Sequence, residues 1–156
     1  MKEVSRISKL FADQSEGQSW LGFSLLETLN QISAKEAASR PFPGFNSIWE
    51  TVSHLLHWRQ TVLRRLQGET VEVPEDNYFS SVSNRSDQAW QQLLQRFRQS
   101  TQDLLNLIGK ENAASLSRMS THPPFTRYEL LLGLLQHEAY HLGQIRLLHR
   151  LARFRG

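Results

Sequence analysis

The sequence predicts an all-α protein, a four-helix bundle with long connections. Apolar residues recur at helical spacing in four segments, and capping residues, glycines or prolines mark most of their ends. Only Val71 and Val73 suggest a very short strand, and nothing in the sequence supports a sheet. The 156 residues are the length of one domain that can bury a core without disulfides, so we expect a single domain over residues 1–156.

The first helical segment is expected from about Glu3 to Ile32. Gly17 and Gly22 predict an interruption or kink within it. The stretch RPFPG at residues 40–44 is a strong stop, because proline cannot continue a helix. The apolar positions that define the segment are Ile7, Leu10, Phe11, Leu21, Leu25, Leu29 and Ile32.

The second helix is expected from Ser47 to about Gln67. It opens on the stretch SIWE, which matches a capping box, and Gly68 follows its end. Residues 69–85 then connect this helix to the next. Such a long connection is unusual unless it crosses the bundle or covers a site.

The third and fourth helices complete the bundle. The third is expected from about Ser86 to Ile108, where Gly109 ends it. The fourth opens on the stretch TRYE at residues 126–129, a second capping box, and runs nearly to the last residue.

The composition is that of an ordinary globular protein and excludes several classes of site. Hydrophobic residues make up 39% of the chain and charged residues 21%. The chain has no cysteine, which excludes a disulfide scaffold, a zinc ribbon and a cysteine nucleophile. No apolar run has the length of a signal peptide or approaches the ~18 residues of a membrane span. We therefore expect a cytoplasmic protein.

The net charge of +3 and the sequence pI near 9.6 raise the question of nucleic-acid binding. Part of the excess lies in four arginines near the end of the chain, Arg146, Arg150, Arg153 and Arg155. The first three fall in a narrow arc of the helix, roughly opposite His137 and His141, where a basic stripe is usually solvated. These arginines also suit the negative end of the helix dipole. Without a recognition motif beside them, we do not expect a nucleic-acid partner.

Two histidines, His137 and His141, lie four residues apart in the stretch QHEAYHLGQ of the fourth helix. This spacing stacks their side chains on one face, where two imidazoles can share one ion. The same face carries Leu130, Ile145 and Leu148, so both imidazoles are expected to point into the bundle. Two histidines at ligand spacing on an apolar face indicate a metal site more strongly than one buried histidine would.

A third imidazole is available in the second helix, where either His54 or His57 could point inward. If the second and fourth helices are neighbours, it completes a set of three ligands. Gly133, one turn before His137, leaves space for water or substrate. Gln144 returns to the same face and could hydrogen-bond a ligand or a bound molecule.

Two glutamates lie near these histidines. Glu50 is one turn from His54, but its place in the capping box is the simpler account. Glu138 lies between His137 and His141 in the pattern H-E-x-x-H of zinc proteases.

The rest of a protease site is missing. No acidic residue follows Glu138 to act as a third ligand. The longer metzincin pattern fails because Gln144 and Leu147 stand where Gly and His are required. Glu138 is also rotated by ~100° from His137, toward the flank of the apolar face. The pattern is therefore interpreted as a different metal site.

Together these residues resemble the DinB-like, or DinB/YfiT-like, superfamily of small metal-binding four-helix proteins, over nearly the whole chain. Three stretches carry the resemblance: PGFNSIWE at residues 43–50 leading into His54, PEDNYF at residues 74–79, and HEAYHLGQI at residues 137–145. The combination of the N-terminal and C-terminal stretches is specific for this superfamily, whereas either one alone would not be.

The resemblance implies an up-up-down-down bundle with a long connection between the second and third helices. It also implies a divalent metal, nickel or zinc, held by His54, His137 and His141. His57 does not match a ligand position of the family. Many relatives are homodimers, so a homodimer is expected here as well.

The function that the resemblance favours is a metal-dependent S-transferase, which uses a low-molecular-weight thiol such as bacillithiol or mycothiol on a small-molecule substrate. Because the chain has no cysteine, the sulfur has to come from outside. Glu138, Tyr140 and Gln144 are the candidates for proton transfer or orientation. The alternatives are a metal-dependent hydrolase and a non-enzymatic dimer that binds a metal or a small ligand.

Overall fold

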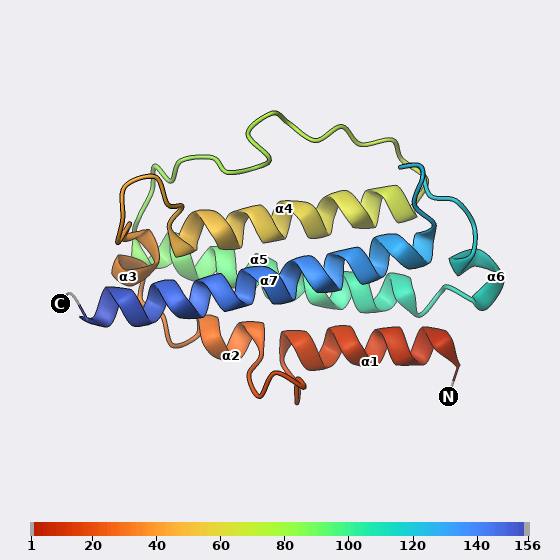
Figure 1. Cartoon of the computed structure of the whole chain (residues 1–156), viewed down its shortest axis with the longest axis horizontal. Helices are drawn as coiled ribbons and strands as arrows, with labels where there is room; N and C mark the ends of the chain where they lie inside the picture. The colour runs from red at the N-terminus through yellow and green to blue at the C-terminus, as the bar shows by residue number, and fades with distance from the viewer. Residues whose placement is uncertain (1, 155–156) are drawn as a thin grey trace.

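The computed structural model describes residues 2–154 and is all-helical. The described residues form no β-strand, and their single β-bridge joins Met119 to Thr126. None of their helices is long and apolar enough to cross a membrane. Of the helices in the described residues, four are long and lie side by side, and three are short and sit in the connections (Figure 1). The long helices are α1 (Glu3–Ser15), α4 (Ile48–Leu66), α5 (Asp87–Ile108) and α7 (Arg127–Phe154); the short ones are α2 (Leu25–Leu29), α3 (Ala34–Ala38) and α6 (Ala113–Leu116).

Helices α4 and α5 run in one direction, and α1 and α7 run in the other (Figure 1). Trp49 near the start of α4 packs on Trp90 near the start of α5, with ring centroids 5.1 Å apart. Farther along both helices, Arg59 Nη1 donates to Thr101 Oγ1 at 2.7 Å. The expected up-up-down-down order is therefore wrong, because the first and second long helices are antiparallel.

The connections explain these directions. After α1, residues 16–47 carry the chain through α2 and α3 to the far end of the bundle, so α4 has to run back (Figure 1). The connection of residues 67–86 then joins two parallel helices and returns along the whole length of α4. About twenty extended residues span up to ~65 Å, more than twice the ~28 Å length of α4.

The helix boundaries agree with the expected ones except in the first segment. Helices α4, α5 and α7 directly follow Ser47, Ser86 and Thr126, as their capping residues predict. The first segment breaks after Ser15, close to the expected interruption, and Gly22 takes a positive φ of 78°. A capping box of Ser33 and Glu36 starts the separate helix α3, which the sequence interpretation missed. Residues 67–86, including Val71 and Val73, form no strand.

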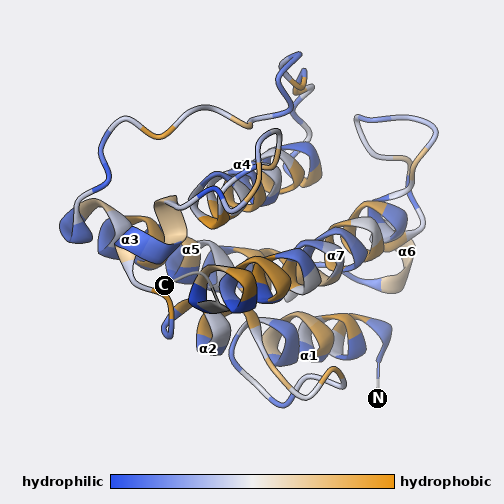
Figure 2. Ribbon diagram, turned by 60° about the vertical axis from the view of Figure 1, so that its left-hand side comes forward, coloured by the Kyte–Doolittle hydropathy of each residue, from blue (hydrophilic) through white to orange (hydrophobic). Residues whose placement is uncertain are grey.

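The apolar faces of the long helices build two buried clusters, one at each end of the bundle. Figure 2 shows both hydrophobic and hydrophilic residues on every long helix, as expected for amphipathic helices with one face inward. One cluster surrounds Trp49 and Trp90, and the other surrounds Ile7 and Phe11. A layer of buried polar side chains lies between them and includes His54, Arg59 and Glu138. Arg155, the last of the four arginines near the end of the chain, lies outside the described residues.

The start of α4 provides a test of its capping box. Burial raises the pKa of Glu50, but hydrogen bonds from the Ser47 backbone N–H and hydroxyl and from Arg40 outweigh it, so the net pKa is lowered from the usual 4.5. A lowered pKa stabilises the folded state above pH 4.5, and this stabilisation is lost as the pH falls through the folded-state pKa. We expect Glu50→Gln to be less stable than the wild type at neutral pH, with the difference shrinking in acid.

Urea unfolding of both proteins across the acid range measures this difference. Ser47→Ala should lower the free energy of unfolding by about 1 kcal/mol, because it removes the serine side chain of the capping box. Glu75→Gln, at an exposed position, is the matched control and should leave the free energy of unfolding unchanged. A constant difference between Glu50→Gln and the wild type at all pH values would contradict the assignment.

Candidate metal centre

Three imidazoles from two helices meet at one point in the polar layer. The Nε2 atom of His137 lies 2.9 Å from Nε2 of His54 and 3.0 Å from Nε2 of His141. The ligand atoms of all three residues lie within 4.8 Å of one another. His137 and His141 share a face of α7, and the antiparallel α4 brings His54 opposite them. These three histidines could therefore hold one metal ion.

Hydrogen bonds to the outer nitrogens fix the tautomers of two of these rings. The Nδ1–H of His54 donates to the carbonyl oxygen of Asn77 at 2.7 Å. The Nδ1 atom of His141 lies 2.7 Å from the side-chain oxygen of Gln144, which can only accept. In the neutral imidazoles Nε2 therefore carries a lone pair, and both lone pairs are directed at His137. A cation at this point would stabilise the convergence of three nitrogens.

Burial keeps these histidines neutral. Burial, together with the neighbouring imidazoles of His141 and His54, lowers the pKa of His137 to about 4. It also lowers the pKa of His54 to about 4, although the hydrogen bond to Asn77 acts in the opposite direction. Burial likewise lowers the pKa of His141. At neutral pH all three rings are unprotonated, which is the form that binds metals.

The nitrogen separations fit a metal with open positions. With metal–nitrogen bonds of about 2.0–2.1 Å, neighbouring nitrogens 2.9–3.0 Å apart subtend an angle of about 90° at the ion. Three histidine ligands would leave an ion with further positions for water or substrate, as in catalytic rather than structural sites.

The connection of residues 67–86 covers the centre. Besides the Asn77 carbonyl, the ring of Phe79 stacks on His54 with centroids 4.0 Å apart and planes at 12°. The Asn77 side chain accepts from Trp58 Nε1 at 3.1 Å. Asn77 and Tyr78 have positive φ angles of 51° and 63°, which turn the backbone carbonyl toward His54. The connection thus lies over the histidines, which is one of the two alternatives that its length suggested, although the length alone could not identify Asn77 and Phe79.

Gln144 and Tyr140 extend the centre toward the surface. The amide nitrogen of Gln144 donates to the Tyr140 hydroxyl at 2.8 Å, while its oxygen contacts His141. The expected position of Gln144 on the face of the histidines is thus confirmed. Tyr140 is 63% exposed, so a bound molecule can reach its hydroxyl.

Glu138 lies on the other side of α7, in the centre of the bundle. Its carboxylate is fully buried and accepts from Nε and Nη2 of Arg59, the second at 3.0 Å. The remaining donors of Arg59 are bound by residues of α5 and by the end of α1, namely Phe97, Ser100, Thr101 and Ser15. The structure therefore brings Tyr140 and Gln144 to the histidines and directs Glu138 away from them.

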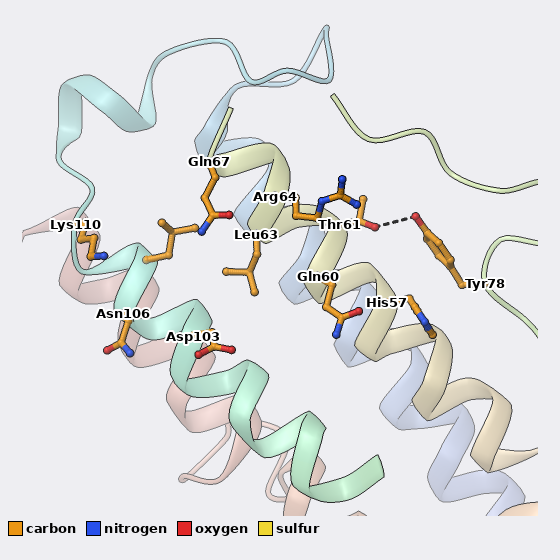
Figure 3. Close-up of a pocket in the computed structure, with 11 residues that line it drawn as sticks. His57, Gln60, Thr61, Leu63, Arg64, Gln67, Tyr78, Asp103, Asn106 and Lys110 are labelled. Carbon is orange, nitrogen blue, oxygen red and sulfur yellow. Dashed lines mark hydrogen bonds between the residues drawn. The ribbon is translucent and has the colours of Figure 1, made fainter. Parts of the chain in front are cut away.

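The other histidines and Glu50 lie outside the centre. His57 borders an open groove of about 570 Å³ between α4 and α5, where its ring stacks on Tyr78 (Figure 3). His149 pairs with Glu36 at 3.4 Å, and His122 stacks on Phe125. Glu50 is held by its capping box, as expected.

Comparison with known proteins agrees with this arrangement. A model of the DinB superfamily matches residues 24–145, most of the chain. The chain belongs to the DinB superfamily.

A crystal structure of a conserved protein from Enterococcus faecalis has a similar fold, with a TM-score of 0.69 at 18% sequence identity. The alignment covers 97% of this chain and 98% of that one. The comparison with curated proteins finds no match.

In this DinB-superfamily protein, two clefts approach the histidines from opposite sides. One, of about 360 Å³, reaches His137 between α4 and the start of α7, beside Gly133. A Cβ added at Gly133 would meet no atom within 4 Å. The space that the sequence predicted one turn before His137 is therefore present. The other, of about 420 Å³, reaches His141 past Phe79 and Tyr140.

The ligand set predicts the outcome of histidine substitutions. His54→Ala and His141→Ala should each abolish stoichiometric binding of nickel or zinc, because two imidazoles alone do not complete the site. His122→Ala and His149→Ala are matched controls and should still bind one ion per chain. Elemental analysis after reloading measures the stoichiometry, and one ion per chain in His54→Ala would show that the ligand set is wrong.

The position of Glu138 predicts a loss of stability. Glu138→Gln should lower the free energy of unfolding by about 3–5 kcal/mol, because it leaves the buried Arg59 charge unpaired. Replacing both partners, with Arg59→Met and Glu138→Leu, should recover most of the free energy of unfolding that the single variant loses. Urea unfolding measures both, and an unchanged stability in the single variant would contradict a structural role for the pair.

Proposed function

We propose that this protein is a metal-dependent S-transferase that joins a low-molecular-weight thiol to a small electrophilic substrate. The observation that carries the proposal is the convergence of three neutral imidazoles, from His54, His137 and His141, at a point that two clefts approach. A site of this kind leaves an ion open to an outside ligand.

Nickel or zinc fits the three nitrogen ligands. Such an ion supplies Lewis acidity, which lowers the pKa of a thiol that binds to it. Because the chain contains no cysteine, the reacting sulfur belongs to the cosubstrate. The thiol loses its proton, its sulfur forms a bond to the electrophilic carbon, and the leaving group departs with the electron pair of the broken bond.

Two polar residues are placed to assist this chemistry. Gln144 orients His141 through its side-chain oxygen and Tyr140 through its amide nitrogen. Tyr140 is largely exposed and lines the cleft at His141, so its hydroxyl can pass the thiol proton toward solvent. We assign Glu138 a structural role instead, because both of its oxygens are bound to Arg59.

The family resemblance also supports a homodimer. Size-exclusion chromatography with light scattering tests this assembly directly, and a monomeric mass at high concentration would exclude it.

The proposed function predicts a metal-dependent response to thiols. Cobalt- or nickel-loaded protein should bind about one ion per chain and change its visible absorption when a small thiol is added, because the ion would then gain a sulfur ligand. His54→Ala, treated identically, is the control and should give no thiol-dependent spectrum. Metal binding without any response to thiols would contradict the transferase and favour the hydrolase or a non-enzymatic binding protein.

A further inference from the structure

Arg65 is a buried cation without a counter-ion. It is 3% exposed, and its Nη2 donates to the carbonyl of Val71 at 2.8 Å. Its Nε is buried and has no hydrogen-bond partner. Among the described residues, no carboxylate lies within ion-pair distance of it. Burial lowers the pKa of its guanidinium, whereas electrostatic attraction to Tyr78 and Glu72 acts in the opposite direction.

Arg59, on the same helix, shows how this fold treats a buried arginine that has only a structural role. Its guanidinium pairs with Glu138, and every nitrogen donates to a protein acceptor. A buried charge without such partners destabilises the folded state. The difference between the two arginines indicates that the acceptor for Arg65 comes from outside the chain.

Arg65 lines the cleft of about 360 Å³ that ends at His137. Trp58 lies between them, with its ring 5.9 Å from the Arg65 guanidinium and 5.7 Å from the His137 ring. Val62, Leu130, Leu134 and Phe125 form the apolar part of the remaining wall, and Asn77 and His122 also line it. Glu129 also borders the cleft, but its carboxylate is bound by Thr126 in the capping box of α7.

The cleft therefore has a cationic end, an apolar middle and an end at the histidines. Arg65 follows His54 by eleven residues, which is about 16 Å along the axis of α4. Because side chains on a helix lean toward its N-terminus, the guanidinium reaches back over Trp58 and shortens this gap. A ligand that spans both ends needs a chain of several bonds.

We propose that this cleft binds the thiol cosubstrate as an anion, with a carboxylate on Arg65, an apolar chain along Trp58 and the sulfur at the three histidines. The position of the sulfur rests on the proposed function, whereas the carboxylate subsite does not. Arg65 is thus the residue that selects acidic thiols over neutral ones.

Two probes of equal chain length test the selection, mercaptohexanoate and mercaptohexanol. Calorimetric titration of the metal-loaded protein should give an affinity about tenfold or more higher for the acid, as expected for a charge-assisted hydrogen bond at a buried site. Arg65→Met keeps the apolar part of the side chain and should bind both probes equally, while still holding one metal ion per chain. Equal affinities in the wild type, or an unchanged preference in Arg65→Met, would overturn the proposal.

Arg64→Met is the matched control. Arg64 is exposed, pairs with Glu69 and borders the groove of Figure 3 rather than the cleft, so this variant should keep the preference. Arg65→Lys should lose several-fold in preference, because an ammonium group cannot make a bidentate contact, and it provides the test if Arg65→Met does not fold.

A separate titration with hexanoate on metal-free protein distinguishes the two proposals. Hexanoate binding that is lost in Arg65→Met or weakened in Arg65→Lys supports the carboxylate subsite even if thiols never bind the metal. Thiol binding at the metal with no hexanoate binding and no preference for acids would leave the transferase standing and remove the subsite.

Discussion

The buried ion pair between Arg59 and Glu138 holds the four long helices in the arrangement that the metal centre needs. Arg59 belongs to α4 and also donates to side chains of α1 and α5, while Glu138 belongs to α7. Glu138 is the neighbour of His137 in the chain, and Arg59 follows His54 by five residues. Fixing the pair therefore fixes the alignment of α4 against α7, because any shift along the axes would leave two buried charges unpaired, at a cost of several kcal/mol.

This constraint gives the H-E-x-x-H pattern a meaning different from the one it has in a zinc protease. Successive residues on a helix are rotated by ~100°, so the histidines and the glutamate of the pattern face different surroundings. Here the histidines face α4 and the covering connection, and the glutamate faces the centre of the bundle. The same letters thus provide two metal ligands and one structural anion.

Much of the fold could be predicted because its signals are local. The starts of α4 and α7 follow from capping boxes, in which a side chain binds a backbone N–H three residues away. The separate helix α3 carries the same local signal at Ser33 and Glu36, so its start was also predictable from the sequence. The directions of the helices could not be predicted in this way. They depend on where the connections cross the bundle, and the order taken from the family resemblance was wrong.

The features of the candidate site likewise divide into local ones, which the sequence predicts, and long-range ones, which it does not. The sequence by itself determined that His137 and His141 share a face and that Gln144 returns to it, because these relations lie within two turns of one helix. Helical periodicity left both His54 and His57 open; the family resemblance implied His54, and the tertiary structure brings His54 to the other two histidines. It also decided that the Asn77 carbonyl orients His54, that Glu138 binds Arg59, and that Arg65 stays without a counter-ion. Each of these contacts or missing contacts depends on residues far apart in the chain, whose positions follow from the packing of all the helices together.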